Sequence, residues 1–421
     1  MATSPSEAPH RLDPAGGCPH ADNARLLALG AVAPVELPGG IEGMAVLGHD
    51  ALREFLQHPE VAKDVRHFKA LHEGRIAPGW PLLTFATVRG MTTADGTDHR
   101  RLRSLVSRAF TPRRVDGLRP RVEELTDALL DDLAAAAEGV VDLRQRFALP
   151  LPMGVICELL GVDDEFRDPL HRLSNQVVAT DIGPEAALAA NRELVGVLGE
   201  IAASKAAHPG DDLTSALIAA RDEGGDRLGQ EELIGTLVLL IVAGHETTLN
   251  LITNAVRALC AHRDQLGLVR SGAASWADVV EETLRWDSPV SYFPFRYPVR
   301  DLDVDGTKIP AGTPVLAGYS AAGRDKAAHG PDADRFDVTR PARADAVRHL
   351  SLGHGAHYCL GAPLARLEAT VALERLFARF PDLELAVPEK DLPRHASFVG
   401  NSVRELPVRL SASAPPGGTA G

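Results

Sequence analysis

The sequence predicts a mainly α protein with small β-sheets (α+β) from three observations. From about Asp98 to Leu268, apolar residues recur every three or four positions, as they do in amphipathic helices. Strand-like stretches are short and lie near the start of the chain and in its last third. No strand-like stretch leads through GxGxxG into a helix, which argues against a dinucleotide-binding fold. Helices therefore dominate the middle of the chain, and strands lie at its edges.

The individual elements follow in order along the chain. Residues 32–37 and 42–48 have the β-branched content of strands. Residues 299–320 alternate apolar and polar positions around Asp305-Gly306 and Ala311-Gly312, which predicts a hairpin. Three- and four-residue spacing predicts helices over 118–135, 151–160 and 186–203. Residues 1–20 and 411–421, rich in Pro, Gly and Ala or Ser, are expected to be disordered around a single domain over 21–410.

The composition limits the class of protein. The chain of 421 residues has a formal charge of −13, so we expect no nucleic-acid partner, which would need a basic face. No uncharged stretch of 18 apolar residues occurs, and Met1 to His20 lack the apolar core of a secretory signal, so we expect no membrane span and no export. The four cysteines lie far apart with no CxxC pair, which indicates a reducing compartment. We expect a cytoplasmic protein.

The stretch from Glu231 to Leu259 predicts one long central helix. It contains no proline, and its first half is apolar on every side, as in a helix buried in a large domain. At 1.5 Å per residue it would be about 43 Å long. Residues 244–248, Gly-His-Glu-Thr-Thr, interrupt the apolar run and suit a functional site. The alternative is a satisfied polar patch, in which Thr247 bonds back to the carbonyl of Ala243.

Residues 349–377 carry the strongest chemical signal. A glycine-rich turn leads to Cys359, and an apolar helix with Pro363 in its first turn follows. The free N–H groups and positive dipole of a helix start favour a thiolate at that position. The alternative is an inert buried cysteine. Three glycines would let the backbone approach whatever the sulfur binds: Gly353, Gly355 and Gly361.

This loop resembles the haem-binding loop of the cytochrome P-450 monooxygenases, FGxGxHxCxG. Residues 352–361 match it except that Leu352 replaces the phenylalanine. The resemblance covers about residues 25–410 and is to the soluble actinobacterial members. It implies the cytochrome P-450 fold with a long central helix over the haem, a heme b cofactor, and Cys359 as the axial thiolate ligand of its iron. It also places Gly353 and Gly361 in the haem-binding loop. The resemblance further implies a monomeric enzyme.

Three further motifs are similar to the family's, in the same order. Residues 243–248 resemble its oxygen-binding stretch, which implies that Ala243 and Gly244 border the haem and that Gly244 leaves room for dioxygen. Within it, Thr247 would act on the bound dioxygen and Glu246 would relay protons. The ExxR of the family matches Glu282 and Arg285, and Phe336 to Arg340 supplies the arginine of the same structural triad, Arg340.

The resemblance also suggests cations for the two haem propionates. His99 and Arg103 are four residues apart and share one helix face. Arg296 follows the ExxR helix, and His357 precedes the cysteine by two residues. An ordinary surface charge is the alternative for each of the four.

The resemblance implies a reaction in which dioxygen hydroxylates an apolar small molecule such as a steroid, macrolide or polyketide. No flavin or nicotinamide motif occurs, so electrons would come from a ferredoxin system. A local basic cluster could attract an acidic ferredoxin: Arg100, Arg101, Arg108, Arg113 and Arg114. The alternative is that these residues form an ordinary solvated helix face. The residues expected to line the substrate pocket are mostly apolar: Phe85, Val88, Leu240, Ala243, Val290, Phe293, Phe295 and Phe398.

Two other functions account for part of the sequence. A zinc hydrolase could use His354, His357 and Cys359, but their spacing in one loop is awkward for three tetrahedral ligands and HExxH is absent. A haem-binding sensor or carrier without turnover would share the cysteine loop. Glu246 and Thr247 argue against it, because binding alone needs no proton path.

Overall fold

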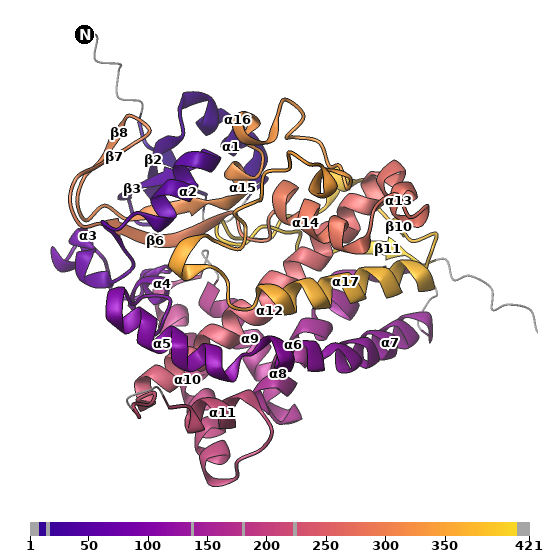
Figure 1. Cartoon of the computed structure of the whole chain (residues 1–421), viewed down its shortest axis with the longest axis horizontal. Coiled ribbons are helices and arrows are strands. Elements are labelled where there is room, and N and C mark those ends of the chain that lie inside the picture. The colour runs from indigo at the N-terminus through magenta and orange to yellow at the C-terminus, as the bar shows by residue number, and fades with distance from the viewer. Residues whose placement is uncertain (1–7, 14–16, 136–138, 179–181, 222–224, 411–421) are drawn as a thin grey trace, which may run out of the picture.

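A computed structural model describes residues 8–13, 17–135, 139–178, 182–221 and 225–410 (Figure 1). The large sheet lies at one end of the molecule with α1, α2, α15 and α16, whereas β10 and β11 lie on the opposite side beside α13, and the long helices form the rest. The described helices of eight or more residues are α1 (Pro19–Leu29), α2 (His49–Gln57), α5 (Gly96–Ala109), α7 (Arg119–Ala135), α8 (Pro150–Leu160), α9 (Arg167–Val178), α10 (Pro184–Ala207), α12 (Gln230–Ala261), α13 (Arg263–Arg270), α14 (Trp276–Trp286) and α17 (Ala362–Arg379). Shorter helical pieces are α3 (Lys69–His72), α4 (Leu83–Thr87), α6 (Pro112–Gly117), η2 (Arg144–Ala148), α11 (Leu213–Ala219), α15 (Tyr319–Ala322), α16 (Lys326–His329) and η5 (Gly355–His357). The predicted mainly α fold with small sheets is confirmed.

The strands form one large sheet and two small ones. The six-stranded sheet has the order β1-β2-β3-β9-β6-β4, and the three-stranded sheet has the order β10-β11-β5. The strands are β1 (His10–Arg11), β2 (Val32–Leu37), β3 (Ile41–Val46), β4 (Val61–Ala62), β5 (Val140–Asp142), β6 (Tyr292–Pro298), β7 (Leu302–Val304), β8 (Thr307–Ile309), β9 (Val315–Gly318), β10 (Glu384–Leu385) and β11 (Pro407–Arg409). The two strands predicted near the start are therefore present as β2 and β3.

The predicted hairpin over 299–320 is only half right. β7 and β8 pair around Asp305 and Gly306, whose φ angles of 50° and 76° suit a two-residue turn. β9 does not continue this hairpin. It runs parallel to β3 and antiparallel to β6, so hydrogen bonds within the large sheet replace those of a local hairpin.

Part of the segment expected to be disordered at the start is ordered. β1 pairs with the edge of β2, and the Leu12 N–H donates to the Glu36 carbonyl at 3.0 Å. Leu12 is buried, and α1 begins at Pro19. The unpaired edge of β2 explains the difference, because it offers backbone partners that composition does not reveal. Residues 1–7 and 411–421 lie outside the described part of the chain.

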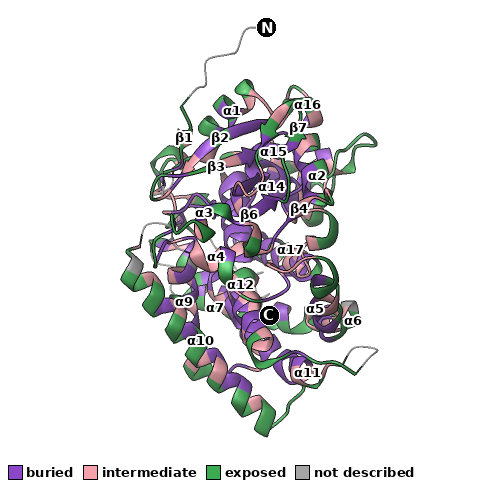
Figure 2. Ribbon diagram, turned by 90° about the vertical axis from the view of Figure 1, so that its left-hand side faces the viewer, coloured by how far each residue is buried: buried purple, intermediate pink, exposed green. Residues whose placement is uncertain are grey.

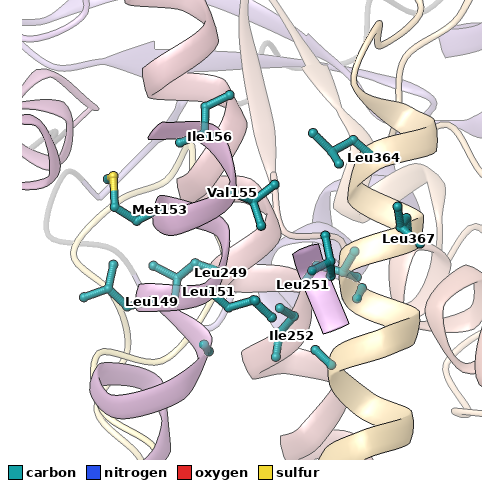
Figure 3. Packing of buried hydrophobic residues seen from close by; sticks show 14 of the residues in the cluster. Leu149, Leu151, Met153, Val155, Ile156, Leu249, Leu251, Ile252, Leu364 and Leu367 are labelled. Atoms are coloured by element: carbon teal, nitrogen blue, oxygen red, sulfur yellow. The ribbon is translucent and has the colours of Figure 1, made fainter. Parts of the chain in front are cut away.

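α12 is the central helix of the protein. Its 32 residues contain the predicted span from Glu231 to Leu259, and α8, α9, α10, α14 and α17 all pack against it. Figure 3 shows Leu251 and Ile252 of α12 beside Val155 of α8 and Leu367 of α17. By length and composition alone α12 could cross a membrane, but helices of the same chain surround it. In Figure 2 buried residues concentrate in this interior, whereas the outer face of α10 is exposed.

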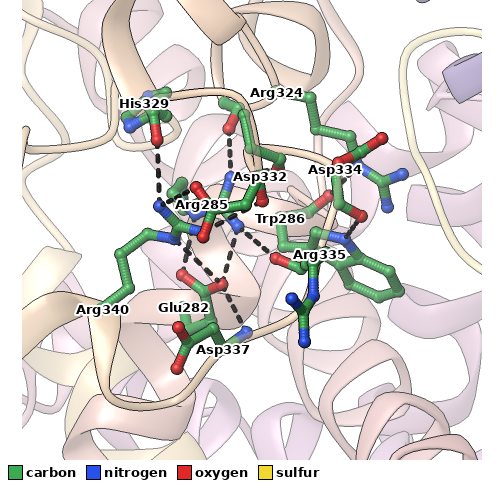
Figure 4. A network of polar contacts seen from close by, with 12 residues as sticks. Glu282, Arg285, Trp286, Arg324, His329, Asp332, Asp334, Arg335, Asp337 and Arg340 are labelled. Carbon is green, nitrogen blue, oxygen red and sulfur yellow. Dashed lines mark hydrogen bonds and ion pairs between the residues drawn. The ribbon is translucent and has the colours of Figure 1, made fainter.

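A buried ionic cluster fixes α14 to the loop before the cysteine segment (Figure 4). Arg285 donates to both oxygens of Glu282, at 2.8 and 2.7 Å, and to the carbonyls of Gly323 and Ala333. Arg340 lies 3.7 Å from the Glu282 carboxylate. Glu282 also accepts the backbone N–H of Asp337. The three residues predicted as a structural triad therefore meet, and each is almost fully buried.

We predict that Glu282→Gln destabilises the protein by about 3–5 kcal/mol, because it leaves the buried Arg285 guanidinium without its anion, whereas Arg340 keeps its ion pair with Asp332. Glu374→Gln, on the exposed side of α17, is the matched control and should change stability by less than about 0.5 kcal/mol. Urea unfolding followed by circular dichroism measures both variants. Equal midpoints for the two would show that the triad does not hold the fold together.

Candidate active site

Cys359 lies between η5 and the start of α17, with its sulfur turned toward the helix. The backbone N–H groups of Gly361 and Ala362 hydrogen-bond to the sulfur. Burial nevertheless raises the pKa of the Cys359 thiol, and these N–H groups and Arg103 offset only part of that rise. The helix start alone therefore does not produce the predicted thiolate. Binding to a metal ion would, since coordination deprotonates a thiol outright.

Two glycines keep the cysteine loop compact. Gly353 has φ 76°, and a Cβ there would lie 3.3 Å from the His357 carbonyl oxygen. A Cβ at Gly361 would lie 4.0 Å from the sulfur of Cys359. A side chain at Gly353 would therefore crowd the backbone, whereas one at Gly361 would make only an ordinary contact with the sulfur.

The four predicted propionate ligands come together beside the cysteine. The rings of His99 and His357 lie 4.1 Å apart, centroid to centroid. Arg103 donates to the Tyr358 carbonyl at 2.7 Å, next to the cysteine. Arg296, on β6, is buried and close enough to His357 to lower its pKa. A fifth basic residue, Lys63, follows β4 and also lowers the pKa of His357.

Too few negative charges lie beside this group of basic side chains to balance them. Burial, Arg296 and His99 lower the pKa of His357 to about 2, and burial holds the pKa of Lys63 well below its ordinary value. Nε2 of His99 is buried and accepts or donates no hydrogen bond within the described chain. Such an arrangement favours a bound anion. The two carboxylates of haem b fit it, with the iron at Cys359.

The middle of α12 presents Thr247 and Glu246 to a cavity. The Thr247 hydroxyl donates to the Ala243 carbonyl at 2.7 Å, as expected of a simple back-bond. Both residues line the cavity, so the same hydroxyl oxygen can also accept a hydrogen bond from that side. Gly244 instead faces α8, where a Cβ would meet Ile156 at 3.0 Å. Helix packing therefore accounts for this glycine without the dioxygen role expected of it.

Glu246 is buried among polar partners. Its Oε1 lies 3.4 Å from Nη2 of Arg144 and accepts from Asn250 at 3.3 Å. Burial alone would raise the pKa of Glu246, but Arg144 and neighbouring histidines outweigh it and hold that pKa below its ordinary value. The carboxylate is therefore ionised and can accept a proton, as its predicted role requires.

A cavity of about 950 Å³ lies over this face of α12. Its lining is mostly apolar and includes five of the eight predicted pocket residues: Phe85, Val88, Ala243, Val290 and Phe293. Polar side chains enter it at few points: Lys63, Thr84, Thr92, Glu246, Thr247, Asn250, His395 and Ser397. An apolar enclosure with a few polar groups is the form of a small-molecule site.

Three predicted pocket residues lie elsewhere. Leu240 packs into the helical core, because the helical period turns Leu239 and Val242 toward the cavity instead. A register shift between Phe293 and Arg296 breaks the strand alternation, so Phe295 stacks on Trp80 in the core. Phe398 lines a second cavity and not this one.

The sequence reasoning missed Lys63, Arg144, Asn250 and His395. Asn250 could have been found, since it lies one helical turn after Glu246 on the same face. The other three lie in segments distant along the chain and show no local pattern.

The basic cluster is partly neutralised. Arg101 is paired with Glu232 and Asp226, and Arg114 lies 3.5 Å from Asp211. Arg100 and Arg113 are exposed.

The zinc alternative finds no support in the geometry. His354 faces Gln57 across 3.2 Å, away from the cysteine. In the described part of the chain no three His, Cys, Asp or Glu side chains are arranged to hold a metal ion.

Comparison with known proteins gives consistent matches. The family described as cytochrome P-450 matches residues 277–404. The 2-hydroxy-5-methyl-1-naphthoate 7-hydroxylase of Streptomyces carzinostaticus is 42% identical over 96% of this chain and 98% of its own. The vitamin D(3) 25-hydroxylase of Pseudonocardia autotrophica is 42% identical over 93% and 94%. The solved structure of CYP154C4 from Streptomyces sp. W2061 superposes with a TM-score of 0.92, at 43% identity over 96% and 98%.

We predict that Cys359→Ala loses the strongly red-shifted Soret band that a thiolate-bound haem gives when reduced and saturated with carbon monoxide. No other described cysteine lies beside the cation group, so nothing can replace the sulfur. Cys18→Ala, at an exposed cysteine, is the control and should keep the band. Haem content, measured on the same samples, separates loss of the ligand from loss of the cofactor. A wild-type band in Cys359→Ala would refute the assignment.

Proposed function

The chain belongs to the cytochrome P-450 family and is an oxygen-incorporating oxidoreductase with haem b; we propose that it hydroxylates an apolar small molecule with electrons from a ferredoxin. The observation that carries the proposal is the position of the cavity. It lies over the one face of α12 that bears Thr247 and an ionised Glu246.

The protein's contribution begins with holding the cofactor. Haem bound through a cysteine thiolate supplies the activation of dioxygen. Cys359 would be the iron ligand, and the Gly361 and Ala362 N–H groups would moderate the charge on its sulfur. His99, Arg103, Arg296 and His357 would hold the propionates, and we add Lys63 to this set because it belongs to the same cation group.

The residues of α12 would manage protons. The Thr247 hydroxyl lines the cavity, and its oxygen would accept a hydrogen bond from a water molecule there while its hydrogen is donated to Ala243. Glu246, ionised beside Arg144, would take up protons and return them through water. General acid catalysis of this kind is worth about 10²–10⁴-fold in rate.

The cavity supports an apolar, ring-containing substrate. Its walls are mostly aromatic and aliphatic, as in sites for apolar small molecules. The two relatives compared above are named for a naphthoate and for vitamin D(3), both of which contain carbon rings. We propose a polycyclic natural product of similar size.

Electrons would enter from the side of α5 and α6. Arg100 and Arg113 are exposed there on a chain of net charge −13, so an acidic ferredoxin would be attracted locally. We propose a monomer that acts in the cytoplasm, where soluble ferredoxins are available. A haem-binding sensor without turnover is the alternative, and the buried Arg144–Glu246 pair argues against it, because storage of haem gives no reason to bury a charge beside the cavity.

We predict that Thr247→Ala uncouples the reaction while haem and substrate binding persist. Electrons would still be consumed, but more of them would leave as hydrogen peroxide and fewer as hydroxylated product. Glu246→Gln should instead slow the whole cycle, since it keeps the shape and removes the proton acceptor. Product and peroxide are measured per nicotinamide oxidised. If Thr247→Ala stays fully coupled, its hydroxyl serves only the back-bond to Ala243.

We predict that reversing Arg100 and Arg113 to Glu slows reduction by ferredoxin and flattens its salt dependence. Turnover driven by hydrogen peroxide should be unaffected, because it bypasses the donor. The control reverses Arg300 and Arg409, which are exposed outside α5 and α6. Stopped-flow reduction at low ionic strength measures the effect. Unchanged rates in the Arg100/Arg113 variant, or equal losses in the control, would place the donor elsewhere.

A further inference from the structure

The proposed hydroxylation needs protons inside the mostly apolar cavity over α12. The balance is RH + O2 + 2 e⁻ + 2 H⁺ → ROH + H2O, so two protons must reach the cavity for each product formed. Glu246 is buried and cannot exchange protons with bulk water directly. A route from solvent to this carboxylate is therefore required, and the inference below rests on the proposed function.

A second cavity lies behind the wall of the first. It has a volume of about 610 Å³ and is far more polar. Three residues line both cavities and so form the wall between them: His395, Ser397 and Gly400. The other polar and titratable groups of the second cavity come from the start of the chain and from residues 291–292 and 401–402: His10, Asp13, Cys18, Asp22, Asn23, Ser291, Tyr292, Asn401 and Ser402.

His395 reaches from this wall toward Glu246. Its Nε2 lies 3.9 Å from Oε1 of Glu246, and its side chain is 25% exposed, so one ring touches both environments. The backbone N–H of His395 donates to the Ser402 carbonyl at 3.1 Å, which anchors the segment. The other carboxylate oxygen of Glu246, Oε2, is buried and has no hydrogen-bond partner in the described structure. A small rotation of the ring would complete a hydrogen bond from Nε2 of His395 to Oε1 of Glu246, the oxygen that it faces.

A second histidine, His245, lies as near to Glu246 but cannot deliver protons. Its Nε2 is 3.9 Å from Oε2 of Glu246. Its Nδ1 lies 2.8 Å from the Ile241 carbonyl, which can only accept, so Nδ1 carries the proton. Burial lowers the pKa of His245, so the ring is neutral and Nε2 has no proton to give. Nε2 accepts instead from Ser174 or His171, at 3.3 and 3.4 Å.

We propose that His395 passes protons from the second cavity to Glu246, and so supplies the protons that the hydroxylation consumes. The ring takes a proton from water in the second cavity at one nitrogen and releases one toward Glu246 at the other. The charged groups that face this path are Arg144, which keeps Glu246 ionised, and the acids of the second cavity, Asp13 and Asp22. His395 acts only through Glu246, so it is a positioning residue and not a catalytic one.

The test compares two variants. His395→Gln keeps the approximate size of the side chain but cannot relay a proton, and His171→Gln changes the residue that contacts His245. His395→Gln should lower the rate of product formation by about 10- to 100-fold and enlarge the solvent deuterium isotope effect. It should also remove the limb of the pH–rate profile due to the relay, with haem content and substrate affinity unchanged. His171→Gln should match wild type in all five measurements. His395→Asn repeats the test with a second side chain.

Three results would overturn the proposal. In the first, His395→Gln matches wild type; in the second, His171→Gln produces the same loss. In the third, both His395 variants lose substrate or haem binding with an unchanged isotope effect, which would make the role structural. If wild type itself forms no hydroxylated product, the proposed function fails and the relay is not at issue.

Nitrogen-15 NMR of the histidine rings gives a readout independent of turnover. His245 should remain the neutral Nδ1–H tautomer across the range in which an ordinary histidine titrates. The His395 ring proton should exchange with solvent faster than that of His245. A His245 that titrates in this range would restore the rival path and contradict the assignment.

Discussion

The burial of α12 is the constraint on which the rest of the structure depends. A helix of 32 residues cannot bury its apolar surface alone, and α8, α9, α10, α14 and α17 are among the helices that pack around it. One face of α12 is not covered by these helices. There a cavity remains between Ala243 and Thr247 on one side and β6 and residues 395–400 on the other. The position of the site is therefore a consequence of helix packing, and its chemistry comes from the few polar residues of α12 that face inward.

Buried charge marks the two ends of this site. On the cysteine side, Lys63, Arg103 and Arg296 lie together with two histidines, and Asp95 offsets only part of the positive charge. On the cavity side, Glu246 is kept ionised by Arg144. Burying charges costs free energy that packing must offset, so both groups indicate function more than stability. The Glu282–Arg285–Arg340 cluster is different, because its charges satisfy one another and backbone carbonyls.

What the sequence predicted follows from how local each signal is. The 3.6-residue period located α12 within two residues at either end, and the motif spacing identified Cys359 and the ionic triad. Phe295 was misplaced because a register shift in β6 reverses the face that a regular strand would present. His395, Lys63 and Arg144 come from loops or irregular turns, where no period exists and only the tertiary fold brings them to the site. The pairing of β1 with β2 was missed for the same reason.

The most direct test of the central claim follows the origin of the oxygen atom. A compound from a panel of polycyclic natural products is first selected because it shifts the Soret band of the haem-loaded protein on binding. It is then converted with reduced ferredoxin under oxygen-18 gas. The monooxygenase account predicts one labelled oxygen in the hydroxylated product and the second in water. A product hydroxyl that carries oxygen from the solvent, or binding without any oxygenated product across all compounds that shift the band, would contradict it.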